Sequence, residues 1–138
     1  MAMKLYISGP MTGVEDLNRP AFADAAETLK AMGVGYMNPF DLEDIEPIPV
    51  LAKYDKGYFD NLRRDIKALV DCTGILLLKG WEVSYGARLE FTIANQLHMP
   101  AYRLFTNTAN RKDSKLEETA TVTSVQFEHL VPSAFWQK

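Results

Sequence analysis

Cysteine and histidine are scarce in this chain: there is one cysteine, Cys72, and there are two histidines among 138 residues. A single cysteine excludes a disulfide within the chain and favours a reducing, cytoplasmic location. The scattered cysteine and histidines lack the spacing of a zinc site, so we expect neither a metal nor a cofactor. We expect Cys72 to be a small buried hydrophobe rather than a nucleophile.

Long apolar runs and a strong charge imbalance are also missing. No run approaches the roughly 20 apolar residues of a membrane span, and Met1–Lys4 leads straight into a predicted strand instead of a signal peptide. The net charge of -3 gives no sign of general binding to nucleic-acid polymers or to membrane surfaces. With 47% hydrophobic and 24% charged residues, the chain can bury the core of one ordered domain.

What is present is an alternation of short apolar strands and amphipathic helices. Strands are predicted over 4–8, 34–37, 74–79 and 101–105. Helices are predicted from the cap Asn18 to Gly33, over 58–70, and through Leu97 after a turn at 80–86. This order predicts an α/β fold with a doubly wound, flavodoxin- or Rossmann-like parallel sheet of four or five strands and helices on both faces.

Two segments break the alternation. Residues 40–57 are acidic and contain prolines, and we interpret them as a lid or wall over a site, or equally as a solvated surface loop. Residues 106–118 are polar and predict a linker or an exposed excursion. We therefore divide the chain into an α/β domain at 1–105 and an extension at 106–138. The apolar part of that extension, 121–136, should dock on the domain or on a neighbouring subunit.

Glu90 is the most unusual polar residue of the pattern. It shares helical spacing with Ala87, Ala94 and Leu97, which should face the sheet, and a carboxylate is costly to bury there unless it is paired or used. The alternative is that an acid in the first turns of a helix complements the helix dipole. The preceding turn, Gly80–Gly86, places a helix N-terminus at the carboxyl end of a strand, which favours an anion.

Further polar groups should meet Glu90 at the carboxyl ends of the strands, where doubly wound sheets bind ligands. Tyr6 and the small-residue loop Ser8–Gly13 follow the first strand. Asp65 lies at the margin of a buried helical stripe, with pairing to Arg63 or Arg64 as its alternative role, whereas Asp60 in the first turn is explained by the helix dipole. Two acids in one crevice can divide the roles of nucleophile and acid, which suits cleavage of a glycosidic bond.

Several separated motifs together resemble a known superfamily. The motifs are Tyr6–Gly13 (YISGPMTG), Asn18–Phe22 (NRPAF), Asn38-Pro39, and Gly80–Glu90 (GWEVSYGARLE). They cover most of residues 4–105 in order, and they resemble the nucleoside 2-deoxyribosyltransferase superfamily. Within that superfamily the chain is similar to the DUF4406 group, which is frequent in phages and prophages.

The resemblance implies a role for each matching residue. Glu90 matches the nucleophile that forms a covalent 2-deoxyribosyl intermediate, Tyr6 matches the tyrosine that positions this carboxylate, and Asp65 matches the acid that serves the leaving base. The remaining residues implied to bind the substrate are Ser8, Gly9, Pro10, Met11, Gly13, Asn38, Trp81, Ser84, Gly86 and Arg88. Trp81 either packs over the helix as a hydrophobic plug or stacks on a base.

Ser84 bears on the substrate. Relatives that hydrolyse deoxynucleoside monophosphates have a serine here that helps to hold the 5′-phosphate, whereas the transferases typically have an acid. Pro10 and Thr12 depart from the pattern, since those hydrolases carry Ser and Arg in the first loop. Arg19 and Arg88 are the candidates to replace the missing charge.

The resulting expectation is an N-glycosidase acting on a (deoxy)nucleoside 5′-monophosphate. The alternatives are a nucleoside 2-deoxyribosyltransferase and a non-catalytic nucleotide-binding or sensor protein. Because relatives complete their sites with a neighbouring subunit, the resemblance also implies a homodimer or a larger homo-oligomer.

Overall fold

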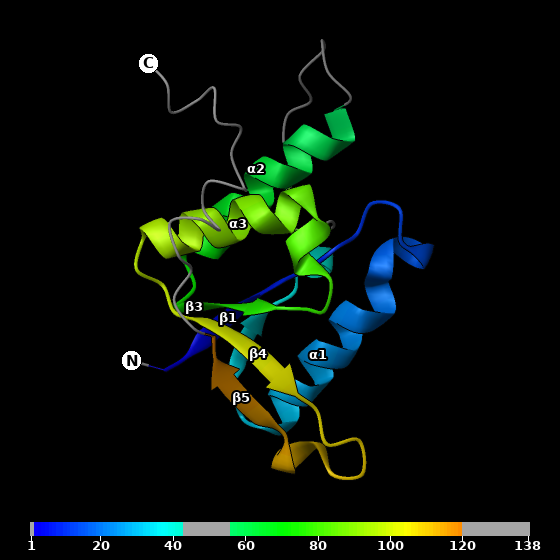
Figure 1. The fold of residues 1–138 in the computed structure, drawn as a ribbon, viewed down its shortest axis with the longest axis vertical. Helices are drawn as coiled ribbons and strands as arrows, with labels where there is room; N and C mark the ends of the chain where they lie inside the picture. Colours follow the sequence, from blue (N-terminus) through cyan, green and yellow to red (C-terminus); the bar gives the residue numbers. More distant parts are fainter. Residues whose placement is uncertain (1, 43–55, 120–138) are drawn as a thin grey trace.

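The fold is an α/β domain with one sheet (Figure 1). The computed structural model describes residues 2–42 and 56–119. Its strands are β1 (Lys4–Ser8), β2 (Gly35–Met37), β3 (Gly74–Leu77), β4 (Ala101–Phe105) and β5 (Lys115–Glu118), and its helices are α1 (Arg19–Ala31), α2 (Lys56–Val70) and α3 (Tyr85–Gln96). Short 3-10 turns are η1 (Glu15–Asn18), η2 (Pro39–Leu42), η3 (Trp81–Val83) and η4 (Arg111–Asp113).

The strand order β2-β1-β3-β4-β5 confirms the predicted doubly wound sheet of four or five strands. Strands β1 to β4 are parallel, and β5 runs antiparallel along β4. This is the flavodoxin-like order, in which the chain changes direction across the sheet between β1 and β3. The site predicted at the carboxyl ends of the strands should therefore lie beside these two strands.

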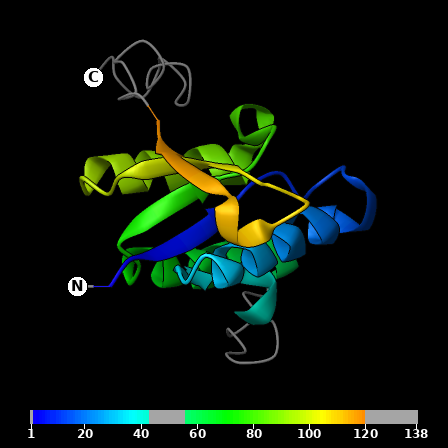
Figure 2. The same ribbon diagram turned by 90° about the horizontal axis from the view of Figure 1, so that it is seen from below.

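Helices cover both faces of the sheet, as predicted. Leu5 and Ile7 of β1 pack with α1 on one face, whereas Tyr6 of β1 packs with α2 and α3 on the other. Side chains alternate along a strand, so neighbouring residues of β1 belong to different core layers. Figure 2, seen from below relative to Figure 1, shows α1 and α3 on opposite sides of the sheet.

The prediction of a linker for 106–118 is wrong at its carboxyl end. Lys115–Glu118 form β5, in register with Phe105–Tyr102 of β4. Leu116 packs into the core layer of α1, while the other three residues of β5 are exposed. Pairing satisfies the backbone groups of β4 that an open edge would leave unpaired, and an exposed edge strand needs few apolar residues.

Residues Asp16, Leu17 and Asn18 have left-handed backbone angles, with φ of 53°, 52° and 64°. Asn18 precedes α1 as predicted, but its side chain makes no capping hydrogen bond. The predicted cap is therefore absent, and the local conformation costs free energy for residues with a Cβ.

Two predicted features lie mostly or wholly outside the residues that the structure describes. The proposed lid lies mostly at 43–55 and the docking tail at 121–136, both outside the described residues. In the part of the chain that is described, no helix has both the length and the apolar character needed to cross a membrane.

Candidate active site

A hollow of about 730 Å³ opens beside the carboxyl ends of β1 and β3, at the point where the strand order reverses. The loop after β1 forms one wall, the start of α3 a second, and α2 a third. The lining residues are Gly9, Pro10, Met11, Thr12, Val14, Leu17, Asn61, Leu62, Asp65, Val83, Ser84, Tyr85, Gly86, Ala87 and Glu90.

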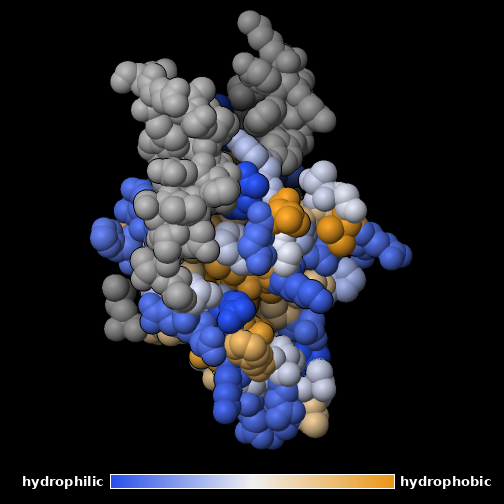
Figure 3. Space-filling view, in the orientation of Figure 1, coloured by the Kyte–Doolittle hydropathy of each residue, from blue (hydrophilic) through white to orange (hydrophobic). Residues whose placement is uncertain are grey.

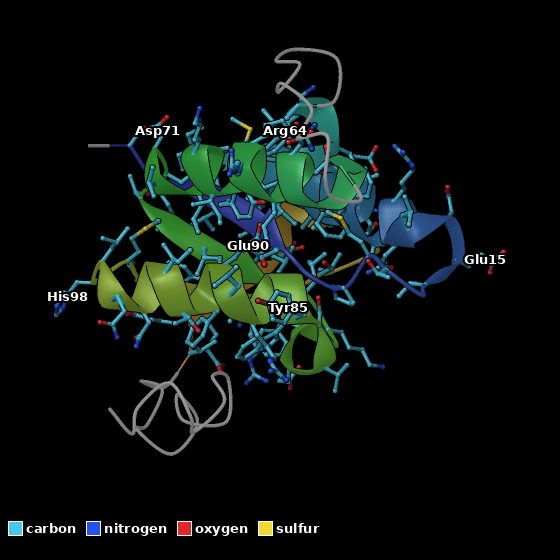
Figure 4. All side chains as sticks on the ribbon, turned by 90° about the horizontal axis from the view of Figure 1, so that it is seen from above. Glu15, Arg64, Asp71, Tyr85, Glu90 and His98 are labelled. Carbon is cyan, nitrogen blue, oxygen red and sulfur yellow. The ribbon has the colours of Figure 1, made fainter. Side chains whose placement is uncertain are left out.

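Glu90 reaches this hollow from the inner side of α3. The helix begins at Tyr85, directly after Ser84, whose Oγ accepts a hydrogen bond of 3.3 Å from the Ala87 backbone N–H. This N-cap fixes the phase of the helix, so Glu90 lies toward the sheet with only 7% of its surface exposed. Figure 4 shows Glu90 between α3 and α2.

Two residues of β1 hold the two oxygens of Glu90. The Tyr6 hydroxyl donates to Oε2 at 2.6 Å, and the Ser8 hydroxyl donates to Oε1 at 2.7 Å. Tyr6 and Ser8 are two positions apart on one strand, so they face the same side of the sheet. The carboxyl group is therefore fixed in position and orientation before any ligand binds.

Burial raises the pKa of Glu90 from 4.5 to about 7. The hydrogen bonds from Tyr6 and Ser8 oppose this rise, and the charge of Asp65 adds to it. Burial also raises the pKa of Tyr6 well above its usual value, with further contributions from Glu90 and Asp65. Tyr6 therefore remains a neutral donor, while Glu90 can exist in both forms near neutral pH.

Asp65 lines the same hollow and is paired with its neighbour on α2. Both Nε and Nη2 of Arg64 lie 3.2 Å from Asp65 Oδ1, and both residues are buried. Asp65 is therefore ion-paired with Arg64 and also lines the hollow that contains Glu90.

Other predicted binding residues divide between the hollow and its surroundings. Those that line it are Gly9, Pro10, Met11, Ser84 and Gly86. Ser8, predicted to bind substrate, instead bonds to Glu90. Gly13 is in the loop after β1 with a φ of 82°, outside the lining.

Three predicted residues lie elsewhere. Asn38 is buried, and its Oδ1 accepts a hydrogen bond of 3.1 Å from the Phe40 backbone N–H. Trp81 packs on Phe91, with ring centroids 4.8 Å apart, which is the plug that the sequence left as one alternative. Arg88 is absent from the lining of the hollow, and its Nε is buried without a hydrogen-bond partner.

Trp81 borders a second hollow of about 560 Å³ on the α1 side of the β3 end. Its walls include Leu78 and Leu104 together with charged Lys79 and Arg103. Figure 3 shows apolar surface near the middle of the face seen in Figure 1, surrounded by hydrophilic surface.

Several lining residues were not predicted. Val14, Leu17, Val83 and Tyr85 border the main hollow and are 38%, 47%, 85% and 63% exposed. Val83 and Tyr85 come from the expected turn Gly80–Gly86, whereas Val14 and Leu17 lie just beyond the expected loop Ser8–Gly13. Large apolar side chains in those loops were the available signal, because such residues are usually buried or used in binding.

The charges of the hollow are unbalanced. Its described lining contains the acids Asp65 and Glu90 and no lysine or arginine. Arg19, a predicted source of positive charge, lies over the Phe40 ring at 4.5 Å instead. The N-terminus of α3 supplies partial positive charge from its backbone N–H groups. Within the described ranges, no cluster of three His, Cys, Asp or Glu is suited to a metal ion.

Comparison with known proteins gives one match. A family model described as a domain of unknown function, DUF4406, matches residues 3–102. This range includes Tyr6, Asp65 and Glu90 and extends from β1 into β4. Comparisons with curated proteins and with solved structures found no match.

Proposed function

The chain belongs to the DUF4406 family, whose function is unknown, and we propose that it cleaves the N-glycosidic bond of a (deoxy)nucleoside 5′-monophosphate. One observation carries the proposal: Glu90 is buried in a ligand-sized hollow with both carboxyl oxygens held by donors from β1. A carboxylate fixed in this way is suited to attack an anomeric carbon. The resemblance to the nucleoside 2-deoxyribosyltransferase superfamily points to the same chemistry.

The reaction has two steps. In the first, ionised Glu90 attacks C1′ of the sugar, the bond from C1′ to the base nitrogen breaks, and Asp65 gives its proton to the departing base. In the second, water attacks C1′, its proton passes to Asp65, and the bond from C1′ to Glu90 breaks. The products are the free base and the sugar 5-phosphate, and both side chains return to their initial forms.

The 5′-phosphate binds at the N-terminus of α3 in this proposal, because the backbone N–H groups there carry partial positive charge. Ser84 uses a lone pair of its hydroxyl to cap the helix, so its O–H hydrogen remains able to donate to a phosphate oxygen. Gly86, also in the lining, lets the backbone approach closely. The carboxylates of Asp65 and Glu90 disfavour an anion elsewhere in the hollow.

A homodimer or larger homo-oligomer is part of the proposal. Val14, Leu17, Val83 and Tyr85 form an exposed apolar rim around the hollow. Exposed apolar residues gathered at one hollow favour contact with another protein surface, and a second copy of the chain is the simplest partner.

The test is base release from the four common nucleotides and from modified pyrimidine nucleotides, followed by chromatography. We expect release from a monophosphate without any acceptor base, and loss of release in Glu90→Ala. Glu82→Gln, which alters an exposed acid on η3, is the matched control and should keep full activity.

Other outcomes would assign a different function. Turnover only in the presence of a second free base would indicate a 2-deoxyribosyltransferase. A nucleotide that binds tightly and is recovered intact would indicate a non-catalytic binding protein. Unchanged turnover in Glu90→Ala would refute both catalytic readings.

A further inference from the structure

Helix α2 buries three charged side chains, which is unusual for one helix. Asp60, Arg64 and Asp65 are only 5%, 7% and 7% exposed. The sequence placed Asp60 in a first helical turn, but α2 begins at Lys56, so Asp60 lies one turn further inside and a dipole effect does not explain it. Buried charges are costly unless they are paired.

The pairing among these three residues is unequal. Arg64 directs two nitrogens to Oδ1 of Asp65. Both oxygens of Asp60 are buried and accept no hydrogen bond from any residue in the described structure. Of these two buried acids, Arg64 therefore bonds to Asp65 and not to Asp60.

Asp60 is nevertheless within reach of Arg64. The two residues are four positions apart on α2, with the acid on the N-terminal side, which is the favourable arrangement for an ion pair on a helix. Figure 4 shows Arg64 on the side of α2 away from Glu90 and α3. Because side chains four positions apart are neighbours on a helix, rotation about the side-chain torsions of Arg64 can direct its guanidinium toward Asp60.

The observed pairing conflicts with the role proposed for Asp65. A guanidinium beside a carboxyl group favours its ionised form. A proton donor to the leaving base must be protonated at that moment. Asp65 therefore needs to lose its contact with Arg64 before the base departs.

We propose that Asp60 is the alternative partner of Arg64, and that Arg64 alternates between Asp65 and Asp60 during each turnover. While Arg64 bonds to Asp60, Asp65 carries a proton and passes it to the base nitrogen as the bond to C1′ breaks. Ionised Asp65 then pairs with Arg64 again, and this pair lasts until Asp65 takes a proton from the attacking water. Asp60 is a positioning residue that touches no substrate, and the inference rests on the proposed function.

Other titratable groups surround this exchange. Tyr6 of β1 and Glu90 of α3 feel the charge of Asp65, and Tyr6 also feels that of Arg64. The turn η2 packs on α2 and contributes Asp41, which is exposed. Glu90 and Tyr6 are held by each other, so Asp60 is the remaining buried acid in the described structure that Arg64 can reach from its present side of α2.

The kinetic test is Asp60→Asn. The asparagine amide has the shape of the Asp60 carboxyl group but no negative charge to attract Arg64. Arg64 should therefore stay paired with Asp65. We expect kcat to fall roughly tenfold or more for nucleotides whose bases are poor leaving groups, and to fall less for those with good leaving groups. In the pH profile, the loss of activity on the alkaline side should begin at a lower pH than in the unaltered protein. The thermal midpoint should rise, because a buried unpartnered carboxyl is removed.

The matched control is Asp71→Asn, which changes an exposed acid just beyond the same helix. It should leave both the leaving-group dependence and the pH profile unchanged. A purely structural role for Asp60 would alter stability without altering either profile. Identical leaving-group dependence in Asp60→Asn and the unaltered protein would overturn the inference.

A crystal structure of Asp65→Asn gives a test that needs no turnover. We expect the Arg64 guanidinium to move to an oxygen of Asp60. A guanidinium that remains beside residue 65 with Asp60 still unpaired would refute the exchange. If the unaltered protein releases no base from any nucleotide, the proposed function fails while this structural readout still decides whether Arg64 has two positions.

Discussion

At the scale of single residues, the role proposed for Glu90 predicts that activity depends on pH. A nucleophilic carboxylate must be ionised, and the pKa of Glu90 is about 7, so kcat/KM should rise as pH increases through about 7. Tyr6→Phe removes a hydrogen bond that lowers this pKa, so the rise should move to higher pH. A pH profile of base release measures the shift. Tyr102→Phe, on a different strand, is the control, and an unmoved profile in Tyr6→Phe would contradict the role of Tyr6.

Glu90 also makes stability depend on pH. Its folded-state pKa of about 7 lies above the usual 4.5, so the stability gained from the proton is full below about 4.5 and is lost as pH rises through 7. Glu90→Gln should therefore stabilise the fold at pH 8 by up to about 3 kcal/mol relative to the unaltered protein. Urea unfolding at pH 4 and pH 8 measures this. An equal difference at both pH values would contradict the buried titration.

The sequence predicted the location of some residues of the hollow and missed the contacts of others. Glu90 was identifiable because it interrupts an apolar stripe, and the structure places Tyr6 against it. The contact of Ser8 with Glu90 was missed, since a small polar residue at a strand end is also typical of a loop that binds ligands. The position of Asp60 was misjudged because the start of α2 was set two residues too late. Hydrogen-bond partners distant in sequence depend on tertiary packing, which periodicity does not describe.

At the scale of elements, Ser84 caps the start of α3 and is also the residue proposed to bind the phosphate. Ser84→Ala removes the cap and should cost about 1 kcal/mol of stability. Ser84→Asp keeps a capping oxygen but adds a negative charge where the phosphate is proposed. We expect KM for a nucleoside monophosphate to rise at least tenfold in Ser84→Asp, with a much smaller change for the uncharged nucleoside. Equal effects on the two substrates would place the phosphate elsewhere.

The loop after β1 and the end of β3 are in close contact at Gly9. A Cβ added to Gly9 would lie 2.8 Å from the Leu78 Cβ, closer than real Cβ atoms approach. Gly9→Ala should therefore cost about 1–3 kcal/mol and displace the wall of the hollow. Thermal unfolding measures the stability. Gly13→Ala is a useful comparison, because its added Cβ meets nothing within 4 Å and the strain comes from φ alone.

Elements with their own periodic pattern were predictable, and those that depend on a neighbour were not. The three helices have apolar stripes of helical period, and β1 and β3 are short apolar runs bounded by glycine. Strand β5 was missed because its sequence, KLEE, is polar and its strand conformation depends on the edge of β4. The left-handed turn at Asp16–Asn18 was missed because no glycine marks it.

At the scale of the whole molecule, the exposed rim predicts association. We expect a homodimer or larger assembly by light scattering. Val83→Asp, at the most exposed position of the rim, should shift the protein toward the monomer. Val70→Asp, an exposed apolar residue at the far end of α2, is the control and should leave the assembly intact. A monomeric unaltered protein would remove the homo-oligomer from the proposal.

The alternation along β1 has a consequence for how sequence change is tolerated. Leu5 and Ile7 pack in the core under α1, whereas Ser8 donates a hydrogen bond to the carboxyl group of Glu90. Tyr6 donates to the same carboxyl group and packs in the opposite core layer, with α2 and α3. In a library that carries every substitution along β1, cellular abundance and turnover can be measured separately. Substitutions at adjacent residues of this strand should reduce different ones of these two quantities. Changes at Leu5 and Ile7 should deplete the protein, whereas changes at Ser8 should leave abundant but inactive protein. A single inserted residue would exchange the two sets and abolish both properties at once.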